Sequence, residues 1–223
     1  FVIFRENTEG LYVGMGGNFK KGTPDEIAIN EMVNTRRGVE RIIRAAFEWA
    51  KSHHKPRVCM SDKANVLSYA HGLWQRVFKE VSSEYPEIQT RHLYADVMAM
   101  EMVRAPQDFD VIVTSNMFGD ILSDLGAELV GGLGLAASAN LHPGRVSLFE
   151  PVHGSAPDIA GQGVANPLAM VLTGSLMLTA LGHKEAALFL DQCVQQVLTK
   201  GEVTADLRSS LGQSTEGALN TQA

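Results

Sequence analysis

The sequence has few cysteines, no block of basic residues and no uninterrupted apolar run of membrane-spanning length. Its 223 residues include two cysteines, Cys59 and Cys193, each within an apolar stretch. Two isolated thiols exclude a disulfide framework and a cysteine-based metal site, and they favour a reducing, cytoplasmic setting. Lysine and arginine number 19 against 25 aspartate and glutamate residues, so the net charge is −6. Because binding to nucleic-acid phosphates needs clustered positive charge, we expect no nucleic-acid partner.

The most apolar stretch, residues 164–181, is interrupted by Asn166, Pro167 and a Thr-Gly-Ser run at 173–175. A buried helix explains this pattern better than a membrane span, so no membrane partner is expected. No signal peptide precedes Phe1, and the first four residues read as a buried strand already under way. We therefore expect the chain to begin inside a fold.

Composition and periodicity indicate an α/β fold. Hydrophobic residues make up 45% and charged residues 20% of the sequence, as in a globular protein of one large or two small domains. Apolar runs typical of strands alternate with helical periodicity. The expected strands are Phe1–Phe4, Arg57–Ser61, Thr90–Tyr94, Val111–Thr114 and Val146–Phe149. The expected helices are 36–50 after the cap Thr35, 67–81, a helix whose apolar stripe is Ile121, Leu122, Leu125 and Leu129, 167–181 after the cap Asn166, and 183–199.

Residues 13–33 do not fit this alternation. Two short apolar segments, 13–17 and 27–33, flank a polar turn at 20–24, which predicts a protruding β-hairpin. An isolated two-stranded hairpin is marginally stable in water, so we expect it to pair with a second subunit. A glycine-rich stretch at 131–137 indicates a domain boundary. It divides the chain into domains at 1–130 and 131–223.

Asp120 and Asp124 form the sharpest local signal for a metal site. They lie four residues apart on a predicted helix, so both carboxylates project from one face with Cβ atoms about 5–6 Å apart. A cation between them would relieve their repulsion, and carboxylate oxygens suit Mg²⁺ or Mn²⁺. The alternative is a solvated acidic edge, extended by Glu128.

Other charged residues follow strands at the carboxyl edge of the sheet, where open α/β folds bind ligands. Lys63 at this edge could act as a base, hold a carboxylate group, or be a plain surface lysine. Asp96, in an otherwise apolar segment, is either a helix cap or a ligand. Arg5 could grip a substrate carboxylate through two hydrogen bonds, or neutralise Glu6 or Glu9.

Two glycine-containing segments are candidates for nucleotide binding. Residues 132–137 match the dinucleotide pattern G-x-G-x-x-A, but a helix precedes them where the pattern needs a strand, so we reject this match. The loop 150–158, EPVHGSAPD, follows a predicted strand and contains two prolines and the polar residues His153 and Asp158. An aspartate there would accept from ribose hydroxyls and repel a 2′-phosphate, favouring NAD over NADP. The alternative is an ordinary ordered turn.

Taken together and in order, the motifs make the sequence similar to the β-decarboxylating dehydrogenases. They are RENTEGLY at 5–12, DKAN at 62–65, the isolated Asp96, NMFGDILSD at 116–124 and EPVHGSAPDIAG at 150–161. This family includes isocitrate, 3-isopropylmalate, homoisocitrate, tartrate and D-malate dehydrogenases. The resemblance covers essentially the whole chain and implies the isocitrate/isopropylmalate dehydrogenase-like fold, with two α/β substructures around a mixed sheet and a hairpin clasp. It further implies that 1–130 is a central dimerisation domain and 131–223 the C-terminal part of a nucleotide-binding domain.

The resemblance also implies a role for each site residue. Lys63, contributed by the partner subunit, and Tyr12 would be the catalytic acid/base pair, and Arg5 would bind a substrate carboxylate. The ligands of Mg²⁺ or Mn²⁺ would be Asp120, Asp124 and, from the partner, Asp96. The residues that bind NAD would be Glu150, His153, Gly154, Ala156, Asp158 and Asn166. NADP-dependent relatives typically carry Lys and Tyr where this sequence has Asp158 and Ile159.

The implied reaction is oxidative decarboxylation of a small 2-hydroxy acid to a 2-keto acid and CO₂ by a homodimer. Residues 16–23 and 34–39 resemble the tartrate/D-malate branch, which we favour, whereas DKANV at 62–66 resembles the isopropylmalate and homoisocitrate branches. The family's leading segment is missing, so this chain alone is expected to be inactive. A catalytically silent assembly subunit and a Mg²⁺-dependent hydrolase using Asp120 and Asp124 are the alternatives.

Overall fold

The computed structural model describes residues 1–142 and 144–222. The chain divides into two compact units, Phe1–Ser123 and Asp124–Ala223, and the division falls inside one helix, α4 (Asn116–Leu129). The glycine-rich stretch at 131–137 thus lies a short way beyond the division.

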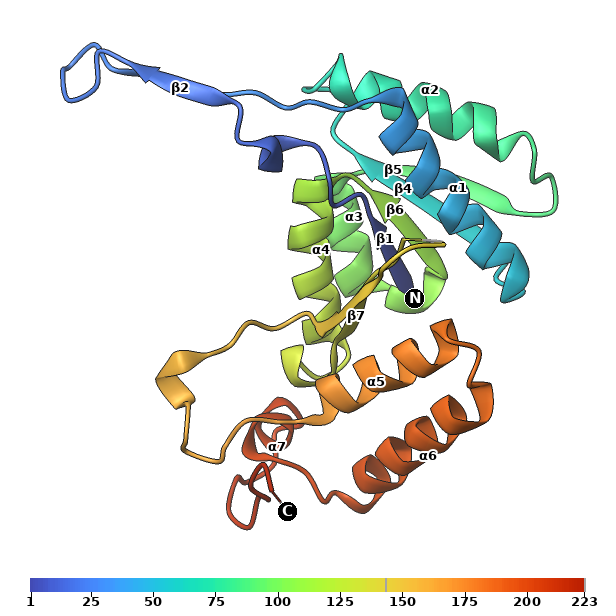
Figure 1. The fold of residues 1–223 in the computed structure, drawn as a ribbon, viewed down its shortest axis with the longest axis vertical. Helices are drawn as coiled ribbons and strands as arrows, with labels where there is room; N and C mark the ends of the chain where they lie inside the picture. The colour runs from blue at the N-terminus through green and yellow to red at the C-terminus, as the bar shows by residue number, and fades with distance from the viewer. Residues whose placement is uncertain (143, 223) are drawn as a thin grey trace. The chain divides into compact units, whose positions relative to one another are not determined.

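The first unit is built on a four-stranded sheet in the order β1-β6-β4-β5, and every pairing in it is parallel. The strands are β1 (Val2–Arg5), β4 (Arg57–Asp62), β5 (Gln89–Tyr94) and β6 (Val111–Thr114). The helices of this unit are α1 (Arg36–Ser52), α2 (Ala70–Ser82), α3 (Ala95–Arg104) and the first part of α4, with short 3₁₀ turns at Leu11–Val13 and Pro106–Asp108. Because parallel strands end at a common edge, the segments that follow β1, β4, β5 and β6 meet there (Figure 1).

The core of this unit lies between the sheet and the pair α1 and α2. The Thr35 hydroxyl accepts the Gly38 N–H at 3.1 Å and starts α1 as predicted. Fully or almost fully buried residues from both helices and from the alternate positions of the central strands fill the core; they include Ile43, Phe47, Val58, Met60, Trp74, Val77, Val111 and Val113. Each such side chain contributes about 1.5–3 kcal/mol through removal from water. The central strands that present the site are therefore held firmly.

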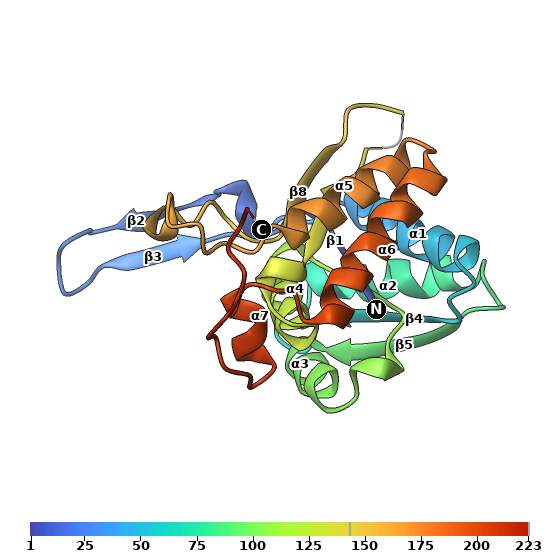
Figure 2. The same cartoon turned by 90° about the horizontal axis from the view of Figure 1, so that it is seen from below.

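The predicted hairpin is present as β2 (Gly16–Phe19) paired antiparallel with β3 (Ile27–Asn30), and it projects away from the sheet of its unit (Figures 1 and 2). Phe19 lies opposite Ile27, and Gly17 lies opposite Ile29. Since side chains alternate along a strand, these apolar residues share one face. Phe19, Ile27 and Ile29 are 59%, 53% and 43% exposed.

The second unit contains a two-stranded antiparallel ribbon and three helices. The ribbon pairs β7 (Ala137–Asn140) with β8 (Leu148–Pro151), and the helices are α5 (Leu168–Ala180), α6 (Lys184–Lys200) and α7 (Ala205–Ser210). Short 3₁₀ turns occur at Leu133–Leu135 and Pro157–Ile159. Helices α5 and α6 pack along each other in both views (Figures 1 and 2).

Several sequence-based boundaries need correction. The strand expected at Val146–Phe149 begins two residues later, because its register is set by pairing with β7, which the sequence did not predict; Val146 is 92% exposed. Pro167 occupies the cap position of α5 and not its first turn, although the Asn166 side chain still accepts the Leu168 N–H at 3.0 Å. Strand β1 is exposed to half-buried because it forms a sheet edge.

Helices α3 and α7 were not predicted, and α2 begins three residues later than expected. Within the described parts of the chain, no helix is both long and apolar enough to cross a membrane.

Candidate functional site

Arg5, the last residue of β1, is held by the first turns of α4. Its Nη1 lies 2.7 Å from Asp120 Oδ1, and its Nε and Nη2 donate to the side-chain oxygen of Asn116 at 3.0 and 2.7 Å. The Asn116 amide in turn donates to the Glu9 carbonyl at 2.9 Å. Of the alternatives left open by the sequence, Glu6 pairs with Arg41 at 3.2 Å and is not neutralised by Arg5.

Gly119 allows the Arg5 side chain to lie across α4. A Cβ atom at Gly119 would come within 2.5 Å of Arg5 Cγ and 2.8 Å of Arg5 Cβ, closer than non-bonded carbon atoms can approach. The glycine in the motif at 116–124 is therefore required by close packing.

Tyr12 lies next to this arginine. The Arg5 guanidinium is 5.4 Å from the centre of the Tyr12 ring, within the range of cation–π attraction. Desolvation and the nearby Asp120 carboxylate raise the pKa of Tyr12 above its ordinary value of 10.0, although Arg5 acts in the opposite direction. The phenol is therefore protonated at neutral pH and can donate a proton.

Asp120 and Asp124 lie one turn apart on α4, as predicted. The Asp120 side chain is 49% exposed and Asp124 is exposed, so both carboxylates are accessible to an ion. In the described parts of this single chain, no group of three His, Cys, Asp or Glu side chains is placed to hold a metal ion. The pair offers the hard oxygen donors that Mg²⁺ and Mn²⁺ prefer, and it leaves positions for ligands from elsewhere.

Lys63 and Asp96 face each other across the ends of β4 and β5. Lys63 Nζ lies 2.6 Å from Asp96 Oδ1 and 6.0 Å from the centre of the Tyr94 ring. The hydrogen bond from Lys63 lowers the pKa of Asp96 below its ordinary value, helped by the first backbone N–H groups of α3. Asp96 lies in the first turn of α3, and 66% of its side chain is exposed.

Sequence reasoning missed two histidines beside Lys63. His71 is fully buried, and its Nδ1 accepts the Lys63 N–H at 2.8 Å. His92 Nε2 lies 3.1 Å from an oxygen of Asp62, itself fully buried. Neither histidine belongs to a motif; for His71 the available signal was a polar residue on the apolar face of α2.

In the second unit, the loop predicted to bind the adenosine group is well exposed. Gly154, Ala156 and Asp158 are exposed, and Ala156 has the left-handed φ of 42°. A non-glycine residue in this conformation is strained, and such strain often marks a functional loop. His153 Nδ1 is 2.9 Å from the Gly154 carbonyl oxygen, and Glu150 accepts from Asn140 at 3.2 Å.

Asn166 joins this loop region to α7, since its amide donates to Asp206 at 3.1 Å. A Cβ at Gly134 would lie 2.7 Å from the Asn166 amide nitrogen and 2.8 Å from the Asp206 carboxylate. The second glycine of the rejected G-x-G-x-x-A match thus makes room for this contact. The match is preceded by α4 and followed by β7, which is not the context of a dinucleotide fingerprint.

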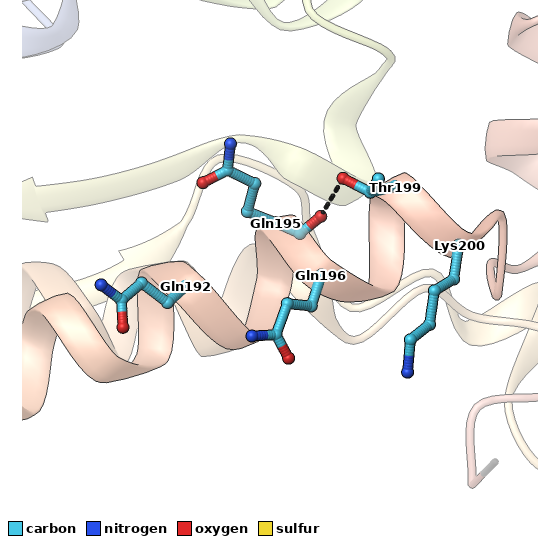
Figure 3. Close-up of a pocket in the computed structure, with 5 residues that line it drawn as sticks. All are labelled: Gln192, Gln195, Gln196, Thr199 and Lys200. Carbon is cyan, nitrogen blue, oxygen red and sulfur yellow. Dashed lines mark hydrogen bonds between the residues drawn. The ribbon is translucent and has the colours of Figure 1, made fainter.

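Two surface hollows are lined by other residues. One of about 340 Å³ runs along the polar face of α6 and is lined by glutamines, Thr199 and Lys200 (Figure 3). The other, of about 370 Å³, lies at the amino ends of β4, β5 and β6 and is flanked by the Arg57–Asp110 ion pair. Neither contains a residue that the sequence assigned to a site.

Comparison with known proteins places these residues in context. Residues 1–222 match the family model described as isocitrate/isopropylmalate dehydrogenase. The chain is 51% identical over 211 residues to a 3-isopropylmalate dehydrogenase of Thermobifida fusca, covering 94% of this chain and 60% of that protein. It is 46% identical over 217 residues to a 3-isopropylmalate dehydrogenase of Streptomyces coelicolor, covering 96% of this chain and 62% of that protein.

A solved structure shares the fold. The isocitrate dehydrogenase of Methylococcus capsulatus superposes with a TM-score of 0.91 at 43% identity, covering 99% of this chain and 63% of that one. The chain therefore spans about three fifths of the length of the relatives it matches.

Proposed function

Since the chain belongs to the isocitrate/isopropylmalate dehydrogenase family, we propose that the protein catalyses NAD- and metal-dependent oxidative decarboxylation of 3-isopropylmalate. The observation that most directly supports this chemistry is the group of Arg5, Tyr12 and Asp120 at the sheet edge. It combines a carboxylate-binding cation, a protonated phenol and a metal-binding carboxylate within one contact network.

The proposed substrate differs from the tartrate or D-malate that the sequence favours. Residues 16–23 and 34–39 resemble the tartrate/D-malate branch, but the two relatives compared above, 51% and 46% identical to this chain, bear the name 3-isopropylmalate dehydrogenase. The alternative indicated by DKANV at 62–66 is thus better supported, and we adopt it.

In the proposed reaction each residue has a defined task. Arg5 binds a substrate carboxylate through its guanidinium. Lys63 of the second copy would take the proton of the C2 hydroxyl while hydride leaves C2 for NAD⁺, and Tyr12 would later protonate the carbon that has lost CO₂. Asp120 and Asp124, together with Asp96 of a second copy, would hold Mg²⁺ or Mn²⁺; the bound cation supplies charge stabilisation at the substrate oxygens.

Sharing the site in this way requires a homodimer, and the apolar face of the β2–β3 hairpin is a suitable surface for it. In the second unit, residues 150–158 and Asn166 would bind the adenosine part of NAD. The exposed Asp158 carboxylate would accept from ribose hydroxyls and repel a 2′-phosphate.

The test is to replace Lys63 by Ala and Tyr12 by Phe in the protein expressed from its whole gene. Loss of general acid–base catalysis should lower kcat about 10²–10⁴-fold with 3-isopropylmalate. Matched controls are Lys55→Ala and Tyr69→Phe, both at exposed positions of the same unit, which should keep the original rate. If both site variants turned over like the original protein, the assignment would be wrong.

A further inference from the structure

Hydrogen bonds hold the backbone of Lys63 at both its N–H and its carbonyl oxygen. Its N–H donates to His71 Nδ1 at 2.8 Å, and its carbonyl oxygen accepts the N–H groups of Val66 and Leu67 at 3.0 and 2.8 Å. The next N–H, that of Ala64, donates to the buried Asp62 carboxylate at 2.9 Å. Only the side chain of Lys63 retains freedom, and its Nζ is directed to Asp96.

Among residues 1–142 and 144–222, His71 is the one whose side chain hydrogen-bonds the Lys63 backbone. Because its Nδ1 accepts a hydrogen bond, the ring proton must lie on Nε2. Burial lowers the pKa of His71, although the charge of Asp62 opposes this, so the ring is neutral. A neutral ring is the state that keeps Nδ1 available as an acceptor.

The other side of the same ring meets α4. The His71 and Phe118 rings lie edge to face, with centres 5.5 Å apart and planes at 83°. Phe118 lies between Asn116 and Asp120, the two residues that hold Arg5. His71 therefore connects the Lys63 turn to the helix that carries the arginine partners.

We infer that His71 is a positioning residue for Lys63: its Nδ1 fixes the turn at the end of β4 and thereby the place from which Nζ reaches the substrate. This inference rests on the proposed role of Lys63 in proton transfer. A displacement of a catalytic group by about 1 Å can cost on the order of 10²-fold in rate. A residue that only filled space at this position would need the size of a histidine but no acceptor at Nδ1.

The first experiment uses the unmodified chain and needs no turnover. A two-bond ¹H–¹⁵N spectrum of the histidine rings reports which nitrogen of His71 is protonated. We expect the proton on Nε2 and slow solvent exchange of the Lys63 amide. A proton on Nδ1, or a rapidly exchanging Lys63 amide, would overturn the inference.

The second experiment compares His71→Asn with His71→Gln. The Asn side-chain oxygen takes the position of Nδ1, whereas the Gln amide reaches the position of Nε2. We expect His71→Asn to retain slow exchange of the Lys63 amide and a kcat within a few-fold of the original. We expect His71→Gln to lose the protection and to lower kcat about 10–100-fold, with little change in KM.

Equal kcat and equal Lys63 protection in the two variants would contradict a positioning role. If His71→Gln does not fold, the spectrum of the unmodified chain still decides the hydrogen bond. Failure of the proposed function would be recognised separately, as turnover that is insensitive to Lys63→Ala while the amide measurements remain as expected.

Discussion

At the scale of single residues, the site depends on which partner each charged group finds. Arg5 could have neutralised either neighbouring glutamate, but it contacts Asn116 and Asp120, more than a hundred positions away along the chain. Asn116 holds the guanidinium through two nitrogens and still donates to the Glu9 backbone. These contacts fix the orientation of the guanidinium, which would lower the cost of binding a substrate carboxylate in the role proposed for Arg5.

Gly119 gives a direct test of this arrangement. We predict that Gly119→Ala displaces Arg5, lowers the free energy of unfolding by about 1–3 kcal/mol through overpacking, and raises KM for the substrate. Thermal unfolding measures the change in stability, and steady-state kinetics measures the change in KM, both on the protein expressed from its whole gene.

Gly174→Ala is the matched control, because Gly174 lies in α5 with no atom near the position of a Cβ. Alanine there should be neutral or stabilising by up to about 1 kcal/mol. Equal stability and equal KM for the two variants would show that Arg5 does not pack against Gly119.

The Arg57–Asp110 pair predicts a pH dependence of stability. Arg57 Nε donates to Asp110 at 2.9 Å, and this hydrogen bond lowers the pKa of Asp110 below its ordinary value of 3.8. Because the folded-state pKa is the lower one, the stabilisation is fully present above the unfolded-state value and is lost as pH falls through the folded-state value. With Arg57 39% exposed, water screens the pair, and its contribution is about 1 kcal/mol or less.

Asp110→Asn should therefore lower the melting temperature near neutral pH by roughly 2–4 °C. The difference from the original protein should shrink as the pH is lowered through the acid range. Asp25→Asn serves as the control, since Asp25 is 77% exposed in the hairpin turn and pairs with Lys20 only at 3.6 Å. A melting-temperature difference for Asp110→Asn that stays constant with pH would contradict the linkage.

At the scale of elements, the β2–β3 hairpin has regular strand pairing but leaves one apolar face exposed. Its strands pair in register, yet Phe19, Ile27 and Ile29 remain exposed on one side. Exposed apolar residues grouped in this way are typical of an interaction surface. A twofold partner would cover the face of both copies at once.

We predict that Ile29→Lys weakens self-association, because a lysine would have to be buried in the hairpin contact. Light scattering coupled to size-exclusion chromatography should show a shift from dimer towards monomer. Val146→Lys, at a position 92% exposed outside the hairpin, should leave the mass unchanged. An Ile29→Lys protein that remained fully dimeric would exclude this face from the interface.

Some helices and strands can be predicted from local sequence patterns, and others cannot. Helix α1 follows from an apolar stripe and its Thr35 cap, both local, and strands β4 and β6 follow from apolar runs. Strand β7 was missed because Ala137–Asn140 lacks β-branched or aromatic residues and becomes a strand only through pairing with β8. Helix α7 was missed because its six residues are too few for a periodic pattern.

At the scale of the whole molecule, the candidate residues are distributed over two compact units. The residues proposed for proton transfer and substrate binding lie in Phe1–Ser123, and those proposed for NAD lie in the second unit. Each group can therefore be tested by the ligand that it would bind.

We predict that NAD⁺ and Mn²⁺ each raise the melting temperature. A ligand at about 100 times its Kd adds about 2.7 kcal/mol to the stability of the state that binds it, or roughly 5–10 °C for a chain of this size. NADP⁺ should have a smaller effect than NAD⁺, because Asp158 would repel its 2′-phosphate. Differential scanning fluorimetry provides the measurement.

The pattern of responses separates the alternatives. Stabilisation by Mn²⁺ without any effect of NAD⁺ would favour a metal-dependent hydrolase, and the absence of both effects would favour an assembly role. Asp158→Lys should reduce the NAD⁺ shift while leaving the Mn²⁺ shift intact, since the residue lies in the loop proposed for the nucleotide.

The sequence by itself determined the α/β class, the family motifs, the hairpin and the identity of the charged residues at the strand ends. The α/β class and the hairpin follow from periodicity and turn chemistry, which act between near neighbours in the chain, and the motifs are recognised by their resemblance to the family. Only the tertiary structure decided that Arg5 contacts α4, that Gly119 and Gly134 are needed for close approach, and that His71 holds Lys63. Such contacts join residues distant in sequence, so they depend on how the strands are ordered and packed.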